Sequence, residues 1–363
     1  MPVAHIDLAV LRHNLELLRT RLGGGCQVLA AVKAGAYGHG TMPVARALEA
    51  SGVSWFGVAT PAEALELRRD GVRGEVLLFG PAFGGGIAEL VEADVILTIA
   101  NVESLEAIRR SGAPGRSRVH LKADTGMGRL GYPPDGALKL AREVDNDPLV
   151  ELEGVWTHFA KADEADRTFT EAQISSFEGF LATLEREGIV APVAHACNSA
   201  GLLAYPAAHY ELVRPGIALY GYPPGYALAG HEPGLTPVMT ITAPVTFLKR
   251  VREGTPVSYG ATWRAPRDTT IATVRFGYAD GYPRLLGNRG WATLHGSRVP
   301  VAGRICMDQL MLDVGDLEVS PGDRVTLLGP KGPTAAELGK LAETISYEML
   351  TSVSPRVERV YSD

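Results

Sequence analysis

Apolar, β-branched runs recur between about residues 7 and 222, and segments with a helical pattern separate them. The eight runs lie at 26–32, 55–60, 75–80, 94–100, 118–124, 152–159, 193–198 and 212–221. Intervening segments such as 61–71 and 101–112 open with Pro or Asn and close on Gly, which are start and stop signals of helices. Near-continuous apolar strands that alternate with helices indicate a parallel sheet covered on both faces. The pattern predicts a closed (β/α)8 barrel of the TIM type, with a doubly wound open sheet as the alternative, because pattern alone does not establish closure.

The texture changes after about residue 230. Strand-like runs with stretches of alternation follow at 236–251, 269–284, 291–314 and 323–329, and one helical stretch covers 334–353. Gly, Pro and Asp turns join these runs, which is typical of a mostly antiparallel β-domain. The Pro- and Gly-rich stretch 221–234 marks the boundary. We therefore expect the barrel over 1–230 and the β-domain over 231–363.

Composition narrows the class of protein. A chain of 363 residues with 46% hydrophobic residues can bury the cores of two domains. Its net charge of −6 argues against nucleic acid or an anionic membrane as a partner. Three widely spaced cysteines fit neither a disulfide framework nor a metal site, so we expect a reducing compartment and no metal. The first residues lack a signal-peptide pattern, and no window approaches the roughly 18 apolar residues of a membrane span, so we expect a soluble, cytoplasmic protein.

Polar residues end five of the eight predicted strands. They are Lys33 after the first, Lys122 and Arg129 after the fifth, His158 in the sixth, Asn198 and Ser199 after the seventh, and Arg214 in the eighth. In a (β/α)8 barrel the carboxyl ends of the strands form the active-site mouth. These side chains would therefore converge, and the positive charges among them indicate a site for an anionic ligand.

Each of these residues also has an ordinary structural explanation. A lysine after a strand is usually solvated, but Lys33 ends an apolar run in which an unpaired ammonium is costly. Ser199 in "NSAG" fits a simple helix start, and the same geometry also binds phosphate. The "GMGRLG" segment at 126–131 matches a dinucleotide-binding pattern, but Tyr132-Pro133-Pro134 prevents a helix from opening there, so we interpret the match as accidental.

A single chemistry accounts for the set. An amine ringed by phosphate-binding and cationic groups suits a Schiff base with pyridoxal phosphate. The aldehyde needs the amine, the phosphate needs helix amides and hydroxyls, and the planar ring needs a flat neighbour such as a histidine. Neither a Walker loop nor an H-E-x-x-H metal motif competes with this interpretation.

At this point the sequence closely resembles a known family, the alanine racemases, which are barrel-type (fold type III) pyridoxal-phosphate enzymes. The matching segments are "AVKAGAYGHG", "KADTGMGRLG", "WTHFAKAD", "HACNSAG", "VRPGIALYG", "PVSYGATW", "GYADGYPR", "GRICMDQ" and "TISYEMLTSV". They run in the order of the family and span nearly the whole chain, including the β-domain.

The resemblance implies a role for each matching residue. Lys33 would hold pyridoxal 5'-phosphate covalently, and Arg214 would donate to the ring nitrogen. The remaining cofactor contacts would be Tyr37, Tyr347, Ser199 and the backbone of Gly216 and Ile217 at the phosphate, His158 at the ring, and Arg129 at the phenolic oxygen and the substrate. A permanent guanidinium at the ring nitrogen should weaken the electron sink, which favours return of the proton to Cα over other outcomes.

Racemisation needs a base on each face of the planar intermediate. The resemblance implies that Lys33 acts on the D-enantiomer of alanine and Tyr259 on the L-enantiomer. Free tyrosine has a pKa of about 10, so a phenolate there needs cationic or hydrogen-bond help. In this family the residues matching Tyr259 and Met307 come from the partner subunit, and the backbone of Met307 would hold the substrate carboxylate. A homodimer with shared sites is therefore implied, and its product would supply D-alanine for peptidoglycan.

Two positions carry open questions. Lys122 resembles a lysine that is carbamylated in this family and then orients the arginine matching Arg129. Gly35 replaces the asparagine of the usual "KANAYGHG", and we hypothesise that it loosens the site or shifts substrate tolerance.

Three alternatives stay open. A racemase of broader specificity is the main one. A non-enzymatic protein that binds pyridoxal phosphate would resemble the barrel only. A barrel-type amino-acid decarboxylase would place a carboxylate, rather than Arg214, at the ring nitrogen.

Overall fold

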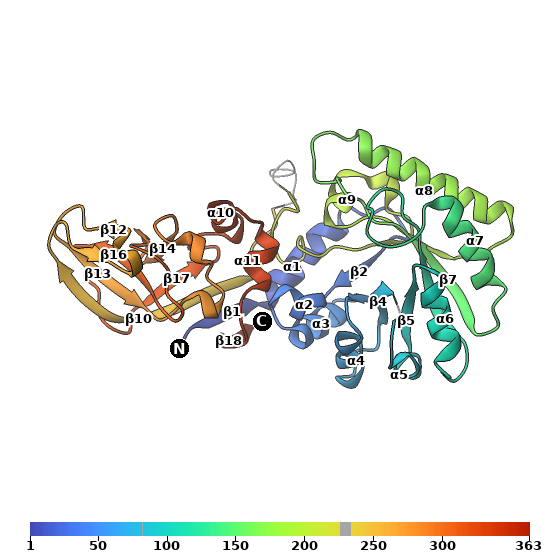
Figure 1. Cartoon of the computed structure of the whole chain (residues 1–363), viewed down its shortest axis with the longest axis horizontal. Coiled ribbons are helices and arrows are strands. Elements are labelled where there is room, and N and C mark those ends of the chain that lie inside the picture. Colours follow the sequence, from blue (N-terminus) through green and yellow to red (C-terminus); the bar gives the residue numbers. More distant parts are fainter. Residues whose placement is uncertain (82, 226–233) are drawn as a thin grey trace.

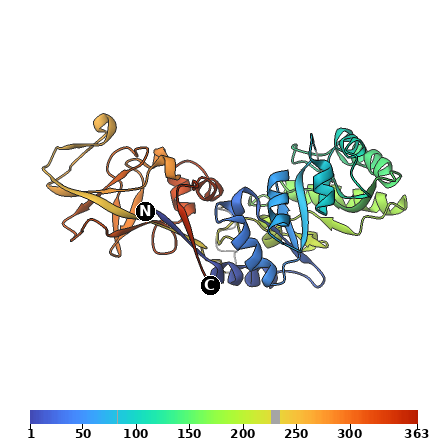
Figure 2. The same cartoon turned by 90° about the horizontal axis from the view of Figure 1, so that it is seen from below.

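The computed structural model describes residues 1–81, 83–225 and 234–363. Two bodies lie side by side along the long axis of the molecule, a barrel and a sheet-rich domain, and the segments at their junction include α1 and α11 (Figures 1 and 2). The expected division between residues 230 and 231 falls outside the described residues and stays a prediction.

A closed parallel barrel forms within the described residues, which confirms the predicted fold and excludes the open sheet. Its strands are β2 (Gln27–Ala31), β3 (Trp55–Val58), β4 (Glu75–Pro81), β5 (Val95–Ile99), β6 (Ser117–Lys122), β7 (Val150–Trp156), β8 (Val193–His195) and β9 (Leu212–Val213). Each coincides with one predicted apolar run. Part of the interior is apolar, and Leu29, Leu77, Ile96 and Leu212 form one buried cluster there with Trp55.

Helices cover the outside of the barrel (Figure 1). They are α1 (Leu8–Arg19), α3 (Thr41–Ala50), α4 (Pro61–Arg69), α5 (Ile87–Glu92), α6 (Val102–Arg110), α7 (Pro134–Asp145), α8 (Thr168–Arg186) and the short α9 (Ser199–Ala204). Thr60 and Asn101 cap α4 and α6 with their side chains, and in both cases the third helical residue bonds back to the cap, so the start signals in the sequence operate as expected.

The predicted β-domain is also confirmed, and its main sheet is mostly antiparallel. The sheet contains β1 (Val3–Asp7), β10 (Met239–Val251), β13 (Thr269–Val274), β14 (Trp291–Leu294), β15 (Ser297–Pro300), β16 (Leu310–Gly315), β17 (Arg324–Leu328) and β18 (Glu358–Ser362). A small ladder of β11 (Pro256–Val257) and β12 (Trp263–Arg264) stands apart.

Strand β1 joins this sheet although it precedes the barrel in sequence. It pairs antiparallel with β10 and parallel with β18, so it lies between them. Sequence reasoning treated the last residues as a tail and did not predict β18. Its side chains alternate between exposed and half-buried, so they give a weak hydrophobic signal.

The predicted helical stretch 334–353 is interrupted. It consists of α10 (Ala335–Leu341) and α11 (Ser346–Thr351), separated by Glu343 at a φ of 58°. Leu338, Gly339 and Lys340 carbonyls accept the backbone bonds that close α10. The break redirects the chain, so α11 lies at the junction with the barrel (Figure 1). None of the helices in the described part of the chain combines the length and apolarity needed to cross a membrane.

Candidate active site

A cavity of about 500 Å³ opens at the carboxyl ends of the barrel strands. It brings together nine of the residues that the sequence predicted for the site, namely Lys33, Tyr37, Arg129, His158, Ser199, Arg214, Gly216, Ile217 and Tyr347. Eight come from the barrel and Tyr347 comes from α11, so the two bodies of one chain build the cavity jointly.

Lys33 stands directly after β2, at the start of a turn with left-handed backbone (α2, Lys33–Tyr37). Ala34, Gly35 and Ala36 have φ values of 52°, 64° and 52°. Each non-glycine residue in this region costs about 1–2 kcal/mol, so the turn needs external support. Glu63 of α4 supplies part of it, because its carboxylate accepts a hydrogen bond from the Ala34 amide at 2.6 Å.

The same turn carries Tyr37 to the cavity. His39 is fully buried, and its Nδ1 donates a hydrogen bond to the Tyr37 carbonyl oxygen at 2.9 Å. The Tyr37 ring stacks on Tyr220 with centroids 4.9 Å apart and lies 6.0 Å from the ring of Tyr347. These aromatic contacts fix both cavity tyrosines in place.

The surroundings of Lys33 favour an uncharged amine. Burial lowers its pKa from the ordinary value, and the positive charges of Arg129 and Arg214 lower it further, against a smaller opposite effect of Glu63. A neutral amine is the form that attacks a carbonyl and accepts a proton.

Arg214 is buried, and its partners within hydrogen-bond distance are all uncharged. Its Nη2 donates to the carbonyl oxygens of Thr157 at 2.9 Å and Ala196 at 2.8 Å. The same nitrogen lies 3.1 Å from His158 Nδ1, and Nη1 lies 2.9 Å from His195 Nδ1. Burial lowers the pKa of Arg214 to about 9, which still leaves it a cation at neutral pH. Burial and the nearby cations, Arg214 first, hold the pKa of His158 well below its usual value, so this ring is neutral.

Ser199 and Gly216 form a concave rim with hydrogen-bonding groups. Ser199 Oγ accepts from the amides of Gly216 at 2.9 Å and Ala218 at 3.3 Å. A Cβ atom at residue 216 would lie only 2.3 Å from the Tyr37 hydroxyl, so glycine is required for this close approach. Two tyrosine hydroxyls, a serine hydroxyl and backbone amides beside a lysine are the donors that a phosphate needs. The residues present therefore fit pyridoxal phosphate.

The loop after β6 holds Arg129 at the rim. The Asp124 carboxylate accepts hydrogen bonds from the amides of Gly126, Met127 and Gly128 at 2.8–3.2 Å. These amides are the ones that a dinucleotide phosphate would use, so the structure supports the interpretation of "GMGRLG" as an accidental match.

Lys122 lies below this loop and is buried at the end of β6. Its amine donates to the Ala123 carbonyl at 2.5 Å and lies 5.1 Å from the Trp156 ring centre. Burial lowers its pKa to about 7, with the charges of Arg214 and Arg129 contributing and Asp124 opposing. Much of this amine is therefore uncharged at neutral pH.

Tyr259 and Met307 do not join the cavity of their own chain. They line a separate hollow of about 600 Å³ on the β-domain, together with Ser258, Cys306, Asp308 and Gln309. Both side chains are exposed, Tyr259 at 68% and Met307 at 53%. The backbone that presents them is unusual, because Ser258 has a φ of 65° and Gly260 a φ of 71°.

Sequence reasoning missed several residues that line or support the cavity. Phe79, Leu130 and Trp156 contribute to its wall, and Glu63 supports the turn after Lys33. The period of two along β6 and β7 is a signal that could have found the inward positions, because alternate residues of a strand share a face. Arg214 directly follows β9, and its four contacts reach residues that lie 18 to 57 positions earlier in the sequence, so no local pattern predicts them.

The fold and the cavity define a barrel protein whose site combines an amine of lowered pKa, the buried cation Arg214 and a set of hydrogen-bonding groups suited to an anion. Comparison with known proteins assigns it further. Residues 6–224 match the family model for the alanine racemase N-terminal domain, and residues 238–361 match the model for the C-terminal domain. An alanine racemase of Methanococcus maripaludis is 41% identical over 99% of this chain and 98% of the relative. One from Thermobifida fusca is 42% identical over 99% of this chain and 97% of the relative.

Solved structures agree with the sequence matches. The alanine racemase of Streptomyces lavendulae superposes with a TM-score of 0.93 at 38% identity, covering 100% of this chain and 97% of that one. The Bacillus anthracis enzyme, solved with bound L-Ala-P, gives 0.94 at 34% identity, with 100% and 95% covered. The chain belongs to the alanine racemase family, whose members are isomerases.

Proposed function

We propose that this protein uses pyridoxal phosphate to interconvert L-alanine and D-alanine, as a homodimer whose two active sites each take residues from both subunits. Its product would serve peptidoglycan synthesis in the cytoplasm. The observation that carries the proposal is the cavity in which Lys33, with a lowered pKa, faces the phosphate-type cradle of Ser199, Gly216 and Tyr37. The bound L-Ala-P in the Bacillus anthracis relative supports alanine as the substrate.

The residues that would hold the cofactor fall into three groups, which would bind it covalently, contact its phosphate or contact its ring. When bound, pyridoxal phosphate supplies the conjugated system that makes the α-proton of an attached amino acid acidic. Lys33 would bind it covalently, and Tyr37, Tyr347, Ser199 and the backbone at 216–217 would bind the phosphate. Arg214 would donate to the ring nitrogen and His158 would support the ring. The positive charge of Arg214 disfavours protonation of that nitrogen, which favours return of the proton to Cα.

Two bases would move the proton. Lys33 Nζ, released from its covalent bond when the substrate amine takes its place, would accept the proton from D-alanine on one face, and the Tyr259 hydroxyl of the partner subunit would act on L-alanine on the other. Arg129 and the backbone of the partner's Met307 would orient the substrate carboxylate. The exposure of Tyr259 and Met307, and their distance from Lys33 within one chain, support a site completed by a second copy.

Lys122 would carry a carbamate. Carbamylation needs an uncharged amine, and the lowered pKa of Lys122 provides it. The product would be an anion near Arg129 and Arg214, and the positive charges of both arginines would stabilise it. The carbamate would in turn orient Arg129. A ¹³C signal from labelled bicarbonate in the wild type, absent in Lys122→Ala, would test this assignment.

The experiment that tests the function is α-hydrogen exchange. Purified protein loaded with pyridoxal phosphate should exchange the α-hydrogen of both alanine enantiomers in deuterated water, followed by proton NMR. Tyr259→Phe should lose exchange of L-alanine more severely than of D-alanine. Tyr210→Phe is the matched control, because its hydroxyl is buried without a partner among the described residues and lies outside the cavity.

If the wild type exchanges the α-hydrogen of neither alanine enantiomer, the racemase assignment is refuted. Equal exchange of serine and alanine would favour a racemase of broader specificity.

A further inference from the structure

A chain of buried side chains leads away from the cavity through the barrel interior. Arg214 Nη1 lies 2.9 Å from His195 Nδ1, and His195 Nε2 lies 2.8 Å from His120 Nδ1. His120 Nε2 then faces Glu153 Oε2 at 3.7 Å, within ion-pair range. Both histidines are fully buried. Neither His120 Nε2 nor Glu153 Oε2 has a hydrogen-bond partner in the part of the chain that the structure describes, so the ion-pair contact between them is the polar contact that each makes.

The chemistry of arginine fixes the direction of every proton in this chain. A guanidinium can only donate, so His195 must accept at Nδ1 and carry its proton on Nε2. That proton points at His120 Nδ1, which must therefore accept, so His120 carries its own proton on Nε2 and directs it to Glu153. A second proton on either ring would place two donors against each other. Three donors, Arg214, His195 and His120, thus point in one direction as one oriented series, and the last of them faces the Glu153 carboxylate.

Two backbone features build this series. Arg118, His120 and Lys122 occupy alternate positions of β6, so they share its inward face at successive depths. The pairing of β6 with β7 shifts between Val119 and His120, because Val119 pairs with Leu152 while His120 pairs with Gly154. Glu153 is the extra residue of this bulge, and bulges of this kind re-aim a side chain.

Gly154 leaves the space that the His120 ring occupies. A Cβ atom at residue 154 would lie 2.7 Å from His120 Cε1 and 2.8 Å from its Nε2. Any larger residue would displace the ring from the position that faces Glu153. The absence of a side chain at 154 therefore belongs to the same arrangement as the bulge.

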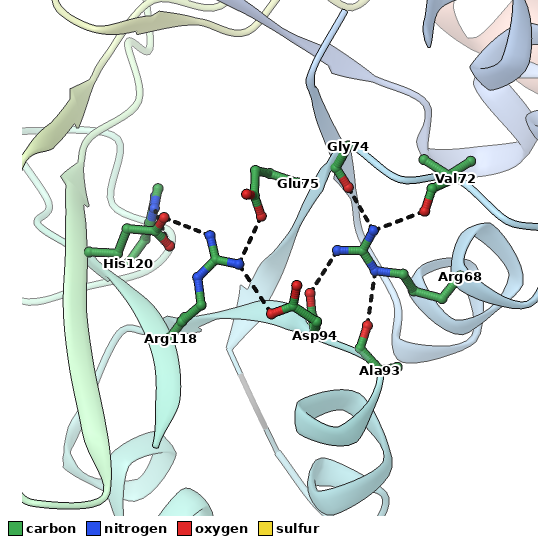
Figure 3. Close-up of polar contacts among 9 residues, drawn as sticks. Arg68, Val72, Gly74, Glu75, Ala93, Asp94, Arg118 and His120 are labelled. Carbon is green, nitrogen blue, oxygen red and sulfur yellow. Dashed lines mark hydrogen bonds and ion pairs between the residues drawn. The ribbon is translucent and has the colours of Figure 1, made fainter. Parts of the chain in front are cut away.

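Glu153 is held in turn by Arg118 at the amino-terminal end of the barrel. Arg118 Nη2 lies 2.7 Å from Glu153 Oε1, and its Nη1 lies 2.8 Å from Glu75 and 3.1 Å from Asp94. Figure 3 shows the Arg118 side chain between Glu75 and Asp94, with His120 beside it. Burial raises the pKa of Glu153, but His120 and Arg118 outweigh that effect, so its pKa lies below the ordinary value and it is ionised.

The buried cation Arg214 needs compensation, and every direct partner described for it is neutral. We propose that Glu153 is a positioning residue for Arg214, acting through His120 and His195. Its negative charge makes His120, and then His195, a stronger acceptor, so Arg214 is fixed and its charge partly balanced without a carboxylate entering the cavity. The significance for racemisation rests on the proposed function, in which Arg214 contacts the cofactor ring.

Other charged and titratable groups face the two rings. His195 has Arg214, His120 and Lys122 near it, with Trp156 stacked at a centroid distance of 5.6 Å. His120 has Glu153, Arg118, Arg214 and His195, with Trp55 at 5.8 Å. Burial, more than any of these charges, lowers the pKa of both histidines. The oriented series therefore persists over the whole neutral pH range.

The first test needs no variant. Protein labelled with ¹⁵N-histidine and loaded with pyridoxal phosphate should show His120 and His195 as neutral rings protonated on Nε2, assigned by proton–nitrogen correlation spectra. A cationic ring, or a ring protonated on Nδ1, at either position would overturn the proposal. This measurement does not depend on racemase activity. The expected tautomers in a protein that fails to exchange alanine would refute the proposed function alone.

The second test compares two carboxylates on the same arginine. Glu153→Gln removes the charge that faces His120, whereas the matched control Glu75→Gln removes a charge from Arg118 and leaves His120 untouched. We expect Glu153→Gln to shift the His195 Nδ1 resonance and to lower kcat roughly tenfold with little change in KM. Glu75→Gln should do neither. Equal effects of the two variants, or no effect of Glu153→Gln on His195, would show a purely structural network and contradict the proposal.

Discussion

The cavity of the barrel and the hollow of the β-domain differ in almost every physical respect. Arg214, at the centre of the first, is 4% exposed and makes four directed contacts, whereas Tyr259 in the second is 68% exposed. Burial and nearby charge shift the pKa values of Lys33 and His158 in the cavity, whereas the hollow presents Tyr259 and Met307 outward, next to Ser258 with its positive φ. In the function proposed above, the barrel cavity would supply one half of each active site, and the hollow of a second copy would supply the other half.

The largest expected effect tests this division directly. Lys33→Ala and Tyr259→Ala should each be inactive, but mixed and exchanged subunits should recover about a quarter of wild-type activity. Equal mixing makes half of the dimers mixed, and each mixed dimer has one intact site of two. Activity would be measured after mild unfolding and refolding of the mixture. Absence of recovery, despite mixed dimers seen by native mass spectrometry, would contradict a shared site.

The next largest effect is a difference in the free energy of unfolding between a variant in the cavity and a variant in the hollow. Arg214→Ala leaves two buried carbonyls and two histidine nitrogens unpaired, so we expect a loss of roughly 2–4 kcal/mol in the free energy of unfolding. Tyr259→Phe removes only an exposed hydroxyl and should change it by less than about 0.5 kcal/mol. Urea unfolding at one fixed protein concentration would measure both. Similar losses of unfolding free energy in the two variants would contradict the contrast between a tightly packed cavity and an exposed hollow.

Acid should act on the barrel before the β-domain. Burial lowers the pKa of His39 to about 4 and also depresses those of His120, His158 and His195, all in the barrel. The unfolded chain binds protons on histidine near pH 6.5, so below that pH it binds more than the folded barrel does. The free energy of unfolding therefore falls as pH drops from 6.5 toward 4, by about 1.4 kcal/mol per pH unit for each histidine.

Hydrogen exchange, corrected for intrinsic rates, would locate this effect. Barrel amides should lose protection at a higher pH than those of β10, β13 and β16. Earlier loss in the β-domain would show that its carboxylates, rather than the buried histidines, govern acid stability.

The smallest effect is expected at Gly35. Its φ of 64° lies in the left-handed region that glycine and asparagine both adopt, and a Cβ atom there would meet nothing within 4 Å. Gly35→Asn should therefore change stability by less than about 0.5 kcal/mol and kcat/KM for alanine by less than about twofold. A larger change, or a changed ratio between alanine and serine, would support the hypothesis that Gly35 alters substrate tolerance.

The sequence predicted the elements better than it predicted the contacts between them. All eight barrel strands are visible in the sequence as apolar runs, because a strand that is buried on both faces must be apolar. Lys33 and Arg214 stand out because they interrupt such runs. The series from Arg214 to Glu153 does not, because it depends on one bulge and on pairings among β6, β7 and β8 that no local pattern encodes. Strand β18 was missed for a related reason, since its partner β1 lies more than 350 residues earlier.

Strand β1 sets the order in which the molecule can be completed. It is made before the barrel, yet its neighbours β10 and β18 follow only after the last barrel strand. During synthesis the barrel helices and strands can assemble while β1 waits unpaired, and β18 finds its only described neighbour in β1. A fragment covering 238–361 would lack the strand that joins β10 to β18 and would leave an open sheet edge. The main sheet of the β-domain can thus be completed only after the barrel and β18 have both been made.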